Sequence, residues 1–193
     1  KNKVRPEKVR TFKDFTSLPT TSKKEYLVKY PLEQLCWDGS LKKPLGFSST
    51  SGSTGQPFYF PRDYKLEWQY SVIAEMFAKN GIRNSHGPTL MIMGLSMGVW
   101  IGGLMTEQAF RIAGQRSNYP LSIITTGINK EEIFKALKLL APRFSQVILV
   151  GYPPFVKDIL DEAPLRGINL KKLNLRLLFA AESFTEKFRD YVI

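Results

Sequence analysis

The sequence has very little cysteine and histidine, with one of each, Cys36 and His86, among its 193 residues. A single cysteine excludes an internal disulfide, and the two residues together are too few for a Cys/His metal cluster. No apolar run reaches the ~18 residues that cross a membrane as a helix. We therefore expect a cytoplasmic protein with no membrane span, in which Cys36 is a small buried apolar residue.

The residues that are abundant describe an ordinary globular protein with a basic surface. Hydrophobic residues make up 43% of the chain and aromatic residues 12%, which excludes a disordered chain. The formal net charge is +11, so a nucleic-acid-binding or scaffold module is one alternative, and its affinity would fall steeply with salt. The basic residues are scattered, however, and we favour a solvated surface or a site for anionic small molecules, with no nucleic acid as partner.

The composition and the hydrophobic pattern of the sequence change near residue 46. Residues 1–45 are polar and dotted with proline, and they predict an extended or helical segment with a short helix from Ser22, where Ser22 and Glu25 can form a capping box. From residue 46 to 193, apolar strand patterns alternate with amphipathic helix patterns. The predicted strands are residues 89–94, 122–127, 146–151 and 175–180, after a short edge strand at 59–60. The predicted helices are residues 64–81, 100–113, 130–140, 153–163 and 184–193.

This alternation predicts the α/β class, with a mostly parallel sheet and helices on both faces. Ligand sites in such sheets lie at the carboxyl ends of the strands. Because the pattern stops inside the last predicted helix, we expect residues 46–193 to be the first part of a larger α/β domain.

The most unusual stretch is residues 47–63, FSSTSGSTGQPFYFPRD. Its serines and threonines supply hydroxyl donors, and Gly52 and Gly55 permit positive φ and close backbone approach. Successive backbone N–H groups in such a loop can form a nest for anions. The stretch lacks the G-x-x-x-x-G-K-[ST] pattern of a P-loop. Composition alone leaves two interpretations open, a linker and a phosphate-binding loop.

The order of residues adds a resemblance to the adenylate-forming superfamily, the acyl-CoA synthetases and their relatives. Residues 50–57, TSGSTGQP, resemble the phosphate loop of that superfamily. Residues 151–154, GYPP, and 179–184, FAAESF, are similar to elements of the phenylacetate–CoA ligases, as is the tail at 185–191. Residues 97–103, MGVWIGG, lie where that branch has an aromatic- and glycine-rich helix start.

The resemblance implies a reaction and a set of site residues. Members of the adenylate-forming superfamily activate a carboxylic acid with ATP and Mg²⁺ to form an acyl-adenylate. They then transfer the acyl group to a thiol such as that of coenzyme A. The acid could be aromatic, and the chain is implied to belong to an AMP-forming acid–thiol ligase. The residues implied to bind the ATP phosphates are Thr50, Ser51, Gly52, Ser53, Thr54 and Gly55. Those implied to border the adenine and acyl pocket are Ala180, Ala181, Glu182, Tyr152 and Trp100.

Two departures from the family pattern limit what this chain can do alone. Gln56 stands where the family usually has lysine, so a charge-assisted contact to phosphate is replaced by a neutral one. The family's segment that serves Mg²⁺ and its catalytic lysine are expected beyond Ile193. We therefore expect no metal ligand within the chain, and we expect these 193 residues alone to be inactive.

A serine hydrolase is the rival enzyme interpretation. Residues 94–98, GLSMG, match G-x-S-x-G, and they follow an apolar strand and precede a helix, as a nucleophile elbow built on Ser96 requires. In that fold the catalytic histidine follows the serine, whereas His86 precedes Ser96. The hydrolase thus remains a weaker alternative to the ligase.

Overall fold

The computed structural model describes residues 5–36, 38–50, 56–81, 87–180 and 182–192. Its contacts divide the chain into two units, which are described separately. The first unit comprises residues 1–44 and 52–58, and the second comprises residues 45–51 and 59–193.

The first unit contains short helices with exposed side chains. They are Pro6–Lys8 (η1), Phe12–Thr16 (α1), Lys23–Leu27 (η2) and Leu32–Leu35 (α2). Ser22 begins η2 as predicted, since its hydroxyl accepts a hydrogen bond from the Glu25 amide at 3.2 Å. The Glu25 carboxylate accepts from that same hydroxyl, at 2.9 Å. The half-buried Cys36 lies just after α2.

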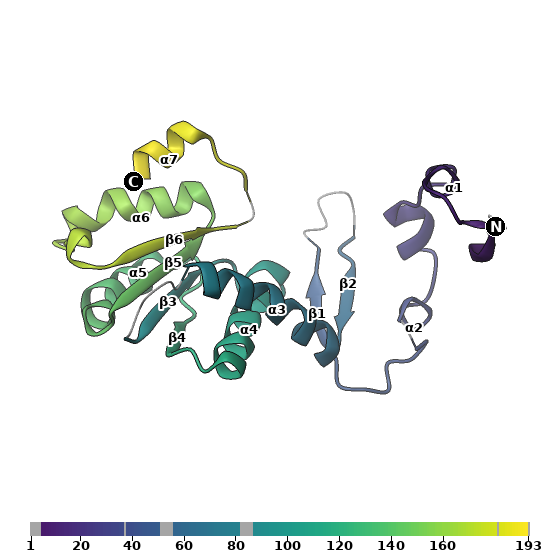
Figure 1. Cartoon of the computed structure of the whole chain (residues 1–193), viewed down its shortest axis with the longest axis horizontal. Helices are drawn as coiled ribbons and strands as arrows, with labels where there is room; N and C mark the ends of the chain where they lie inside the picture. Colours follow the sequence, from purple (N-terminus) through teal and green to yellow (C-terminus); the bar gives the residue numbers. More distant parts are fainter. Residues whose placement is uncertain (1–4, 37, 51–55, 82–86, 181, 193) are drawn as a thin grey trace. The chain divides into compact units, whose positions relative to one another are not determined.

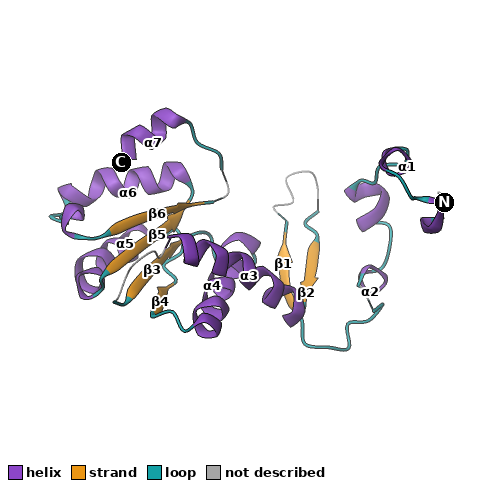
Figure 2. Cartoon of the chain, in the orientation of Figure 1, coloured by secondary structure: helices purple, strands orange, loops and turns teal. Residues whose placement is uncertain are grey.

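The second unit is built on a parallel sheet of four strands in the order β4-β3-β5-β6. The strands are Thr89–Gly94 (β3), Leu121–Ile124 (β4), Gln146–Gly151 (β5) and Leu175–Phe179 (β6). The central strands β3 and β5 are buried along their whole length, as their continuous apolar sequences predicted. Figures 1 and 2 show the strands side by side, with helices on both sides of the sheet.

Helices cover both faces of the sheet, so the predicted α/β class is confirmed. They are Tyr64–Gly81 (α3), Ile101–Ser117 (α4), Lys130–Lys135 (α5), Pro153–Leu165 (α6) and Glu186–Val192 (α7). The short helical segments Ala136–Leu140 (η3), Ala141–Arg143 (η4) and Leu170–Lys172 (η5) connect them to the strands. Leu90 and Leu149 of the sheet pack with α5 and α6, whereas Met91 and Val150, next along the strands, pack with α3 and α4. The alternation follows from the two-residue period of a strand.

A hairpin precedes the sheet in the sequence. Gly46–Ser49 (β1) pairs antiparallel with Tyr59–Arg62 (β2), and Ser48 lies opposite Phe60. Only a short strand at Tyr59 and Phe60 was predicted, because the hydroxyl-rich residues before the loop do not look like a strand. Cross-strand pairing is a tertiary contact that the local sequence does not encode.

Several helix ends differ from the predictions, and two of the differences have a clear physical reason. Gly114 was expected to stop the helix after Trp100, but it lies inside α4, where the site of its missing Cβ is 3.5 Å from Leu121 Cβ. The helix ends instead at Asn118, whose φ of 52° places it in the left-handed region that asparagine tolerates. Thr185 rather than Ser183 caps α7, through a hydrogen bond that its hydroxyl accepts from the Phe188 amide at 3.3 Å.

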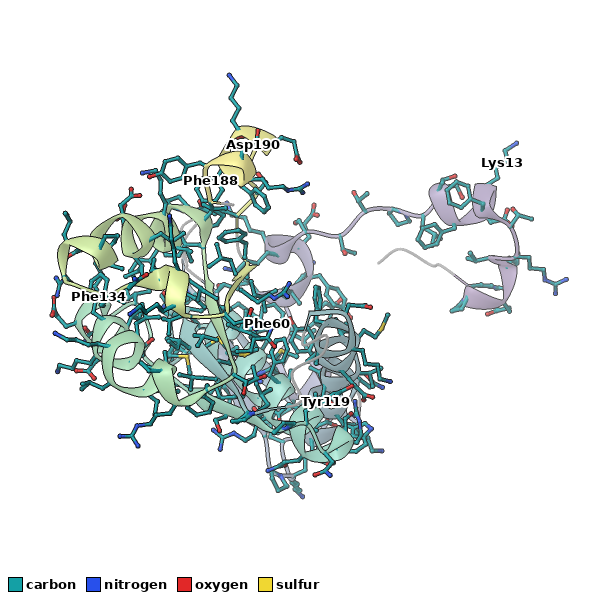
Figure 3. All side chains as sticks on the ribbon, turned by 60° about the vertical axis from the view of Figure 1, so that its left-hand side comes forward. Lys13, Phe60, Tyr119, Phe134, Phe188 and Asp190 are labelled. Carbon is teal, nitrogen blue, oxygen red and sulfur yellow. The ribbon has the colours of Figure 1, made fainter. Side chains whose placement is uncertain are left out.

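The last helix lies over α6 in Figure 1. The Tyr191 hydroxyl bonds the Asp161 carboxylate, and the Lys157 ammonium lies 4.8 Å from the centre of the Tyr191 ring. Phe188, labelled in Figure 3, packs edge-on to Phe179 at the end of β6, with 5.6 Å between ring centres. Within the described part of the chain, no helix combines the length and the apolar character needed to cross a membrane.

Candidate functional site at the carboxyl edge of the sheet

The strand register brings three predicted segments to one edge of the sheet. Gly94 at the end of β3 pairs with Gly151 at the end of β5, and Gly151 pairs with Phe179 of β6. The Ala180 amide then donates to the Gly151 carbonyl oxygen at 3.1 Å. The residues that follow these ends, among them Ser96, Tyr152 and Ala180, are therefore neighbours in space.

The hairpin reaches the same edge through its backbone. The Ser49 amide donates to the Val99 carbonyl oxygen at 2.9 Å, and Ser49 forms a parallel bridge with Trp100, the residue that precedes α4. Thr50, the first residue of the predicted phosphate loop, follows directly. The sequence predicted both Thr50 and Trp100 as site residues, and the structure places them on adjacent segments.

A cavity of about 450 Å³ lies where these segments meet. Its described lining residues are Ser48, Ser49, Thr50, Phe60, Leu95, Ser96, Trp100, Ile101, Gly102, Gly103 and Tyr152. All of them are uncharged and most are apolar, which suits the uncharged part of a small molecule. Thr50, Trp100 and Tyr152, which the sequence predicted, thus share one cavity.

Close packing shapes the wall that α4 contributes. A Cβ on Gly103 would lie 2.2 Å from the Ser96 carbonyl oxygen, so the first turn of α4 can approach the end of β3 only with glycine there. On the opposite side, Tyr152 stacks on Phe155 of α6, with 5.4 Å between ring centres. These contacts hold the cavity walls on helices and strands that are themselves packed.

Ser48 stands out among the lining residues. It is 1% exposed, and among the described residues its buried hydroxyl has no hydrogen-bond partner. Buried hydroxyl groups are nearly always paired, and an unpaired one costs about 1–3 kcal/mol. The neighbouring Ser49 differs, because its hydroxyl donates to the Thr50 carbonyl oxygen at 3.0 Å.

The other predicted site residues do not join the cavity or cannot be placed. Glu182 is exposed, and neither it nor Ala180 is among the lining residues. Ser51, Gly52, Ser53, Thr54, Gly55 and Ala181 lie outside the described residues. Gln56 belongs to the first unit, where its carbonyl oxygen accepts a hydrogen bond from the Lys23 ammonium at 2.9 Å.

Several lining residues were missed from the sequence. Ser48 belongs to the hydroxyl-rich run, yet nothing in the local sequence shows that it is buried in a strand. Phe60 was assigned to an edge strand but not to the site; it belongs to β2 and is labelled in Figure 3. Leu95 and Ile101 look like ordinary core residues. If a hairpin had been predicted between residues 46 and 62 from the sequence, Ser48 and Phe60 would have been candidates for the site.

The geometry around Ser96 does not support the hydrolase alternative. Ser96 lines the cavity, but α4 begins only at Ile101, whereas a nucleophile elbow turns directly from strand to helix at the serine. His86 lies outside the described residues. The described part of the chain has no group of three His, Cys, Asp or Glu side chains placed to hold a metal ion.

Comparisons with known proteins give one kind of match. No protein-family model matches the sequence, and no curated protein matches it. Solved structures do match, including an open conformation of 2-hydroxyisobutyryl-CoA ligase in complex with 2-HIB-AMP and CoA. The identity is 15% and the TM-score 0.69, and the match covers 98% of this chain and 43% of that one.

Other states of that ligase match as well. Its complex in the thioesterification state is 16% identical with a TM-score of 0.68, over 98% of this chain and 39% of that chain. Its postadenylation state with 2-HIB-AMP is 16% identical with a TM-score of 0.62, over 92% of this chain and 36% of that chain. The chain thus spans about two fifths of the length of these ligase structures. Across that length it has the α/β fold of an acyl-CoA ligase, the fold that the resemblance in its sequence implied.

Proposed function

We propose that the chain provides the phosphate-binding and acid-binding part of an enzyme that activates a carboxylic acid with ATP. The product is an acyl-adenylate, and a thiol such as that of coenzyme A then accepts the acyl group. The observation that carries the proposal is the cavity at the carboxyl edge of the sheet, beside the first residue of a loop with the superfamily's phosphate-loop sequence. The fold shared with ligase structures that hold 2-HIB-AMP and CoA supports it.

Each part of the site has a role in this proposal. The loop from Thr50 to Gly55 holds the β- and γ-phosphates through N–H and hydroxyl donors, and so stabilises the charge that develops on the leaving pyrophosphate. Trp100 and Tyr152 form walls for the organic part of the acid, which suits an apolar or aromatic one. Ala180, Ala181 and Glu182 border the adenine at the end of β6.

No group of His, Cys, Asp or Glu among the described residues could hold Mg²⁺, so in this proposal the ion would be bound by the phosphates of ATP. Gln56 provides no cation for the phosphates, and the loop relies on backbone and hydroxyl donors instead. We also propose, from the sequence motifs, that the protein belongs to the phenylacetate–CoA ligase branch. Its low cysteine content supports a cytoplasmic location.

Exchange of labelled pyrophosphate into ATP tests the proposal. The full-length protein is expected to catalyse this exchange with Mg²⁺ and a suitable acid, because adenylate formation is reversible. The panel includes aryl, fatty and short hydroxy acids. If no acid in a broad panel supports exchange, the proposed function is wrong.

A variant in the loop tests the placement of the phosphates. Gly52→Val is expected to abolish nucleotide binding while leaving the circular dichroism spectrum unchanged, since a branched side chain blocks close approach of the backbone. Gln56→Lys is the matched variant, because it restores the cation and is expected to tighten ATP binding. Unchanged ATP affinity in Gly52→Val would place the phosphates elsewhere.

A further inference from the structure

A second cavity lies beside β6, on the face of the sheet that α3 and α4 cover. Its volume of about 330 Å³ is within the range of small-molecule sites. Its described lining residues are Phe77, Ala78, Asn80, Met91, Phe110, Ile148, Arg176, Leu177 and Leu178. None of them lines the cavity at the carboxyl edge of the sheet, so the two cavities are separate places for a ligand.

The wall of this second cavity includes an arginine in a row of apolar residues. Arg176 of β6 pairs with Ile148 of β5, which pairs in turn with Met91 of β3, so the three residues form one row across the sheet. Met91 and Ile148 are buried in the cluster against α3 and α4, and Leu178, two residues further along β6, packs on the same cluster. Because side chains two residues apart on a strand face the same way, the Arg176 side chain leaves the sheet on the side of the cavity.

Arg176 is also the one charged residue among the described residues that line this cavity. No ion pair or hydrogen bond within the described part of the chain engages its guanidinium, whereas Arg116 of α4 pairs with Glu75. The side chain is exposed, so water hydrates its charge. A carboxylate can replace that water with two parallel charge-assisted hydrogen bonds.

The two properties of the cavity select a ligand that has both an anionic and an apolar part. A hydrocarbon gains from leaving water for the apolar walls but makes no use of Arg176. A small inorganic anion pairs with Arg176 but leaves the apolar walls in contact with water. A molecule with a carboxylate at one end and a hydrocarbon at the other uses both.

We propose that this cavity binds a small apolar carboxylic acid. Its carboxylate accepts hydrogen bonds from the Arg176 guanidinium, and its hydrocarbon part lies against Phe77 and Phe110. A medium-chain fatty acid or a single-ring aryl acid has this character. The carboxylate is expected to strengthen binding roughly tenfold over an uncharged analogue. This site is separate from the proposed active site and does not rest on the proposed function.

Photolabelling of the full-length protein tests the proposal. The probe is octanoate that carries a diazirine at its far end, and the labelled peptides are identified by mass spectrometry. Label is expected on residues 77–80 of α3 and 176–178 of β6, which line the cavity. Unlabelled octanoate is expected to compete with the probe roughly tenfold better than octanol, which has the same chain without the charge.

Variants of the lining residues separate the two parts of the site. Arg176→Gln is expected to need roughly tenfold more probe for half-maximal labelling, and Arg176→Lys, which keeps the charge without the fork of donors, an intermediate amount. Ala78→Leu is expected to reduce labelling because the larger side chain occupies the cavity. Arg143→Gln is the matched control, since Arg143 is an exposed arginine that is not among the lining residues, and its labelling is expected to equal that of the wild type.

Three outcomes would overturn the inference. In the first, no label reaches the peptides of α3 and β6, which would mean that the cavity is closed or filled in the full-length protein. In the second, these peptides are labelled but octanol competes as well as octanoate. In the third, Arg176→Gln and Arg143→Gln behave alike. Because labelling needs no catalysis, failure of the proposed function would leave the result of this experiment unchanged.

Discussion

The two faces of the sheet are packed by helices of opposite character. On one face, α6 buries large apolar side chains such as Val156 and Ile159 against the strands. On the other, α3 buries Ser71, Ala74 and Ala78, while Ile73 is 49% and Phe77 56% exposed. Both helices have apolar residues at helical spacing, but only in α6 does the apolar stripe coincide with the buried face.

Polar links accompany the small residues of α3. Glu67 accepts hydrogen bonds from Arg62 at 3.2 Å and from Gln108 of α4, and so joins the hairpin to both helices. Arg116 of α4 donates to Glu75 and to the Ser71 hydroxyl, and its guanidinium lies 4.8 Å from the Trp68 ring centre. The small buried residues of α3 let it approach α4, whose Phe110 supplies a large apolar side chain to this face, and the polar links join the two helices.

Breaking the Arg62–Glu67 pair is expected to give the largest effect. Both side chains are largely buried, at 2% and 12% exposed, so Glu67→Ala leaves the Arg62 charge without compensation. We expect the free energy of unfolding to fall by about 3–5 kcal/mol, measured by urea denaturation. The double variant Arg62→Met/Glu67→Leu is expected to recover most of that loss. A cost below about 1 kcal/mol for Glu67→Ala would show that the pair is solvated.

Truncating one isoleucine on each face compares the two helices directly. Ile159→Ala in α6 removes a fully buried side chain and is expected to lower the free energy of unfolding by about 2–5 kcal/mol. Ile73→Ala in α3 is expected to change it by about 0.5 kcal/mol or less. Equal losses at the two positions, again in urea, would contradict the difference in burial.

Enlarging a small buried residue probes how closely α3 is packed. Ala74→Leu inserts three carbon atoms where the structure leaves 4% of the residue exposed, and it is expected to cost about 1–3 kcal/mol. Met76→Leu on the exposed side of the same helix is the control and should be nearly neutral. Thermal unfolding followed by circular dichroism measures both. A stabilised Ala74→Leu variant would mean that the face beneath this part of α3 has unfilled space.

The smallest expected effect is a pH dependence of the stability, which comes from the contact of Glu75 in α3 with Arg116 in α4. Hydrogen bonds from Lys79 and then Arg116 lower the pKa of Glu75 from 4.5 to about 2. A lowered pKa in the folded state stabilises the fold fully above pH 4.5, and this stabilisation is lost as the pH falls towards 2. The urea midpoints of wild type and Glu75→Gln should therefore differ most at pH 7, less at pH 3, and converge only as the pH reaches about 2. A difference that persists unchanged at low pH would mean that the charge of Glu75 is not responsible.

The strands and helix starts of the second unit could be predicted because local sequence determines them. Residues 89–94 and 146–151 are apolar without interruption, and the structure has β3 and β5 with those bounds. Asn129 and Asp63, which stand just before the predicted helices at 130–140 and 64–81, are residue types that favour N-caps, and their side chains accept hydrogen bonds from the amides of Glu132 and Leu66, at 3.3 and 3.0 Å. Caps and strands of this kind depend on interactions within a few residues.

The burial of individual side chains and the make-up of the site could not be predicted, because both depend on contacts between residues that are distant in the sequence. The apolar spacing of Leu66, Tyr70, Ile73 and Phe77 located α3 correctly, yet all four side chains are exposed, because α4 and the sheet contact its small residues instead. The same limit applied to the site. Trp100 and Tyr152 were predicted through a resemblance and line the cavity, whereas Ser48 and Phe60, which also line it, were not predicted because their place depends on the hairpin.

The junction between the hairpin and the start of α4 consists of a hydrogen bond between main-chain atoms, from Ser49 to Val99. Exchanging a side chain on either segment therefore leaves the junction in place. Phe60 and Trp100 line the cavity from these two segments. If the cavity holds the acid as proposed, changing either lining side chain would alter the choice of acid while the main-chain junction is kept, which is how a lineage of such proteins could acquire new substrates in single steps.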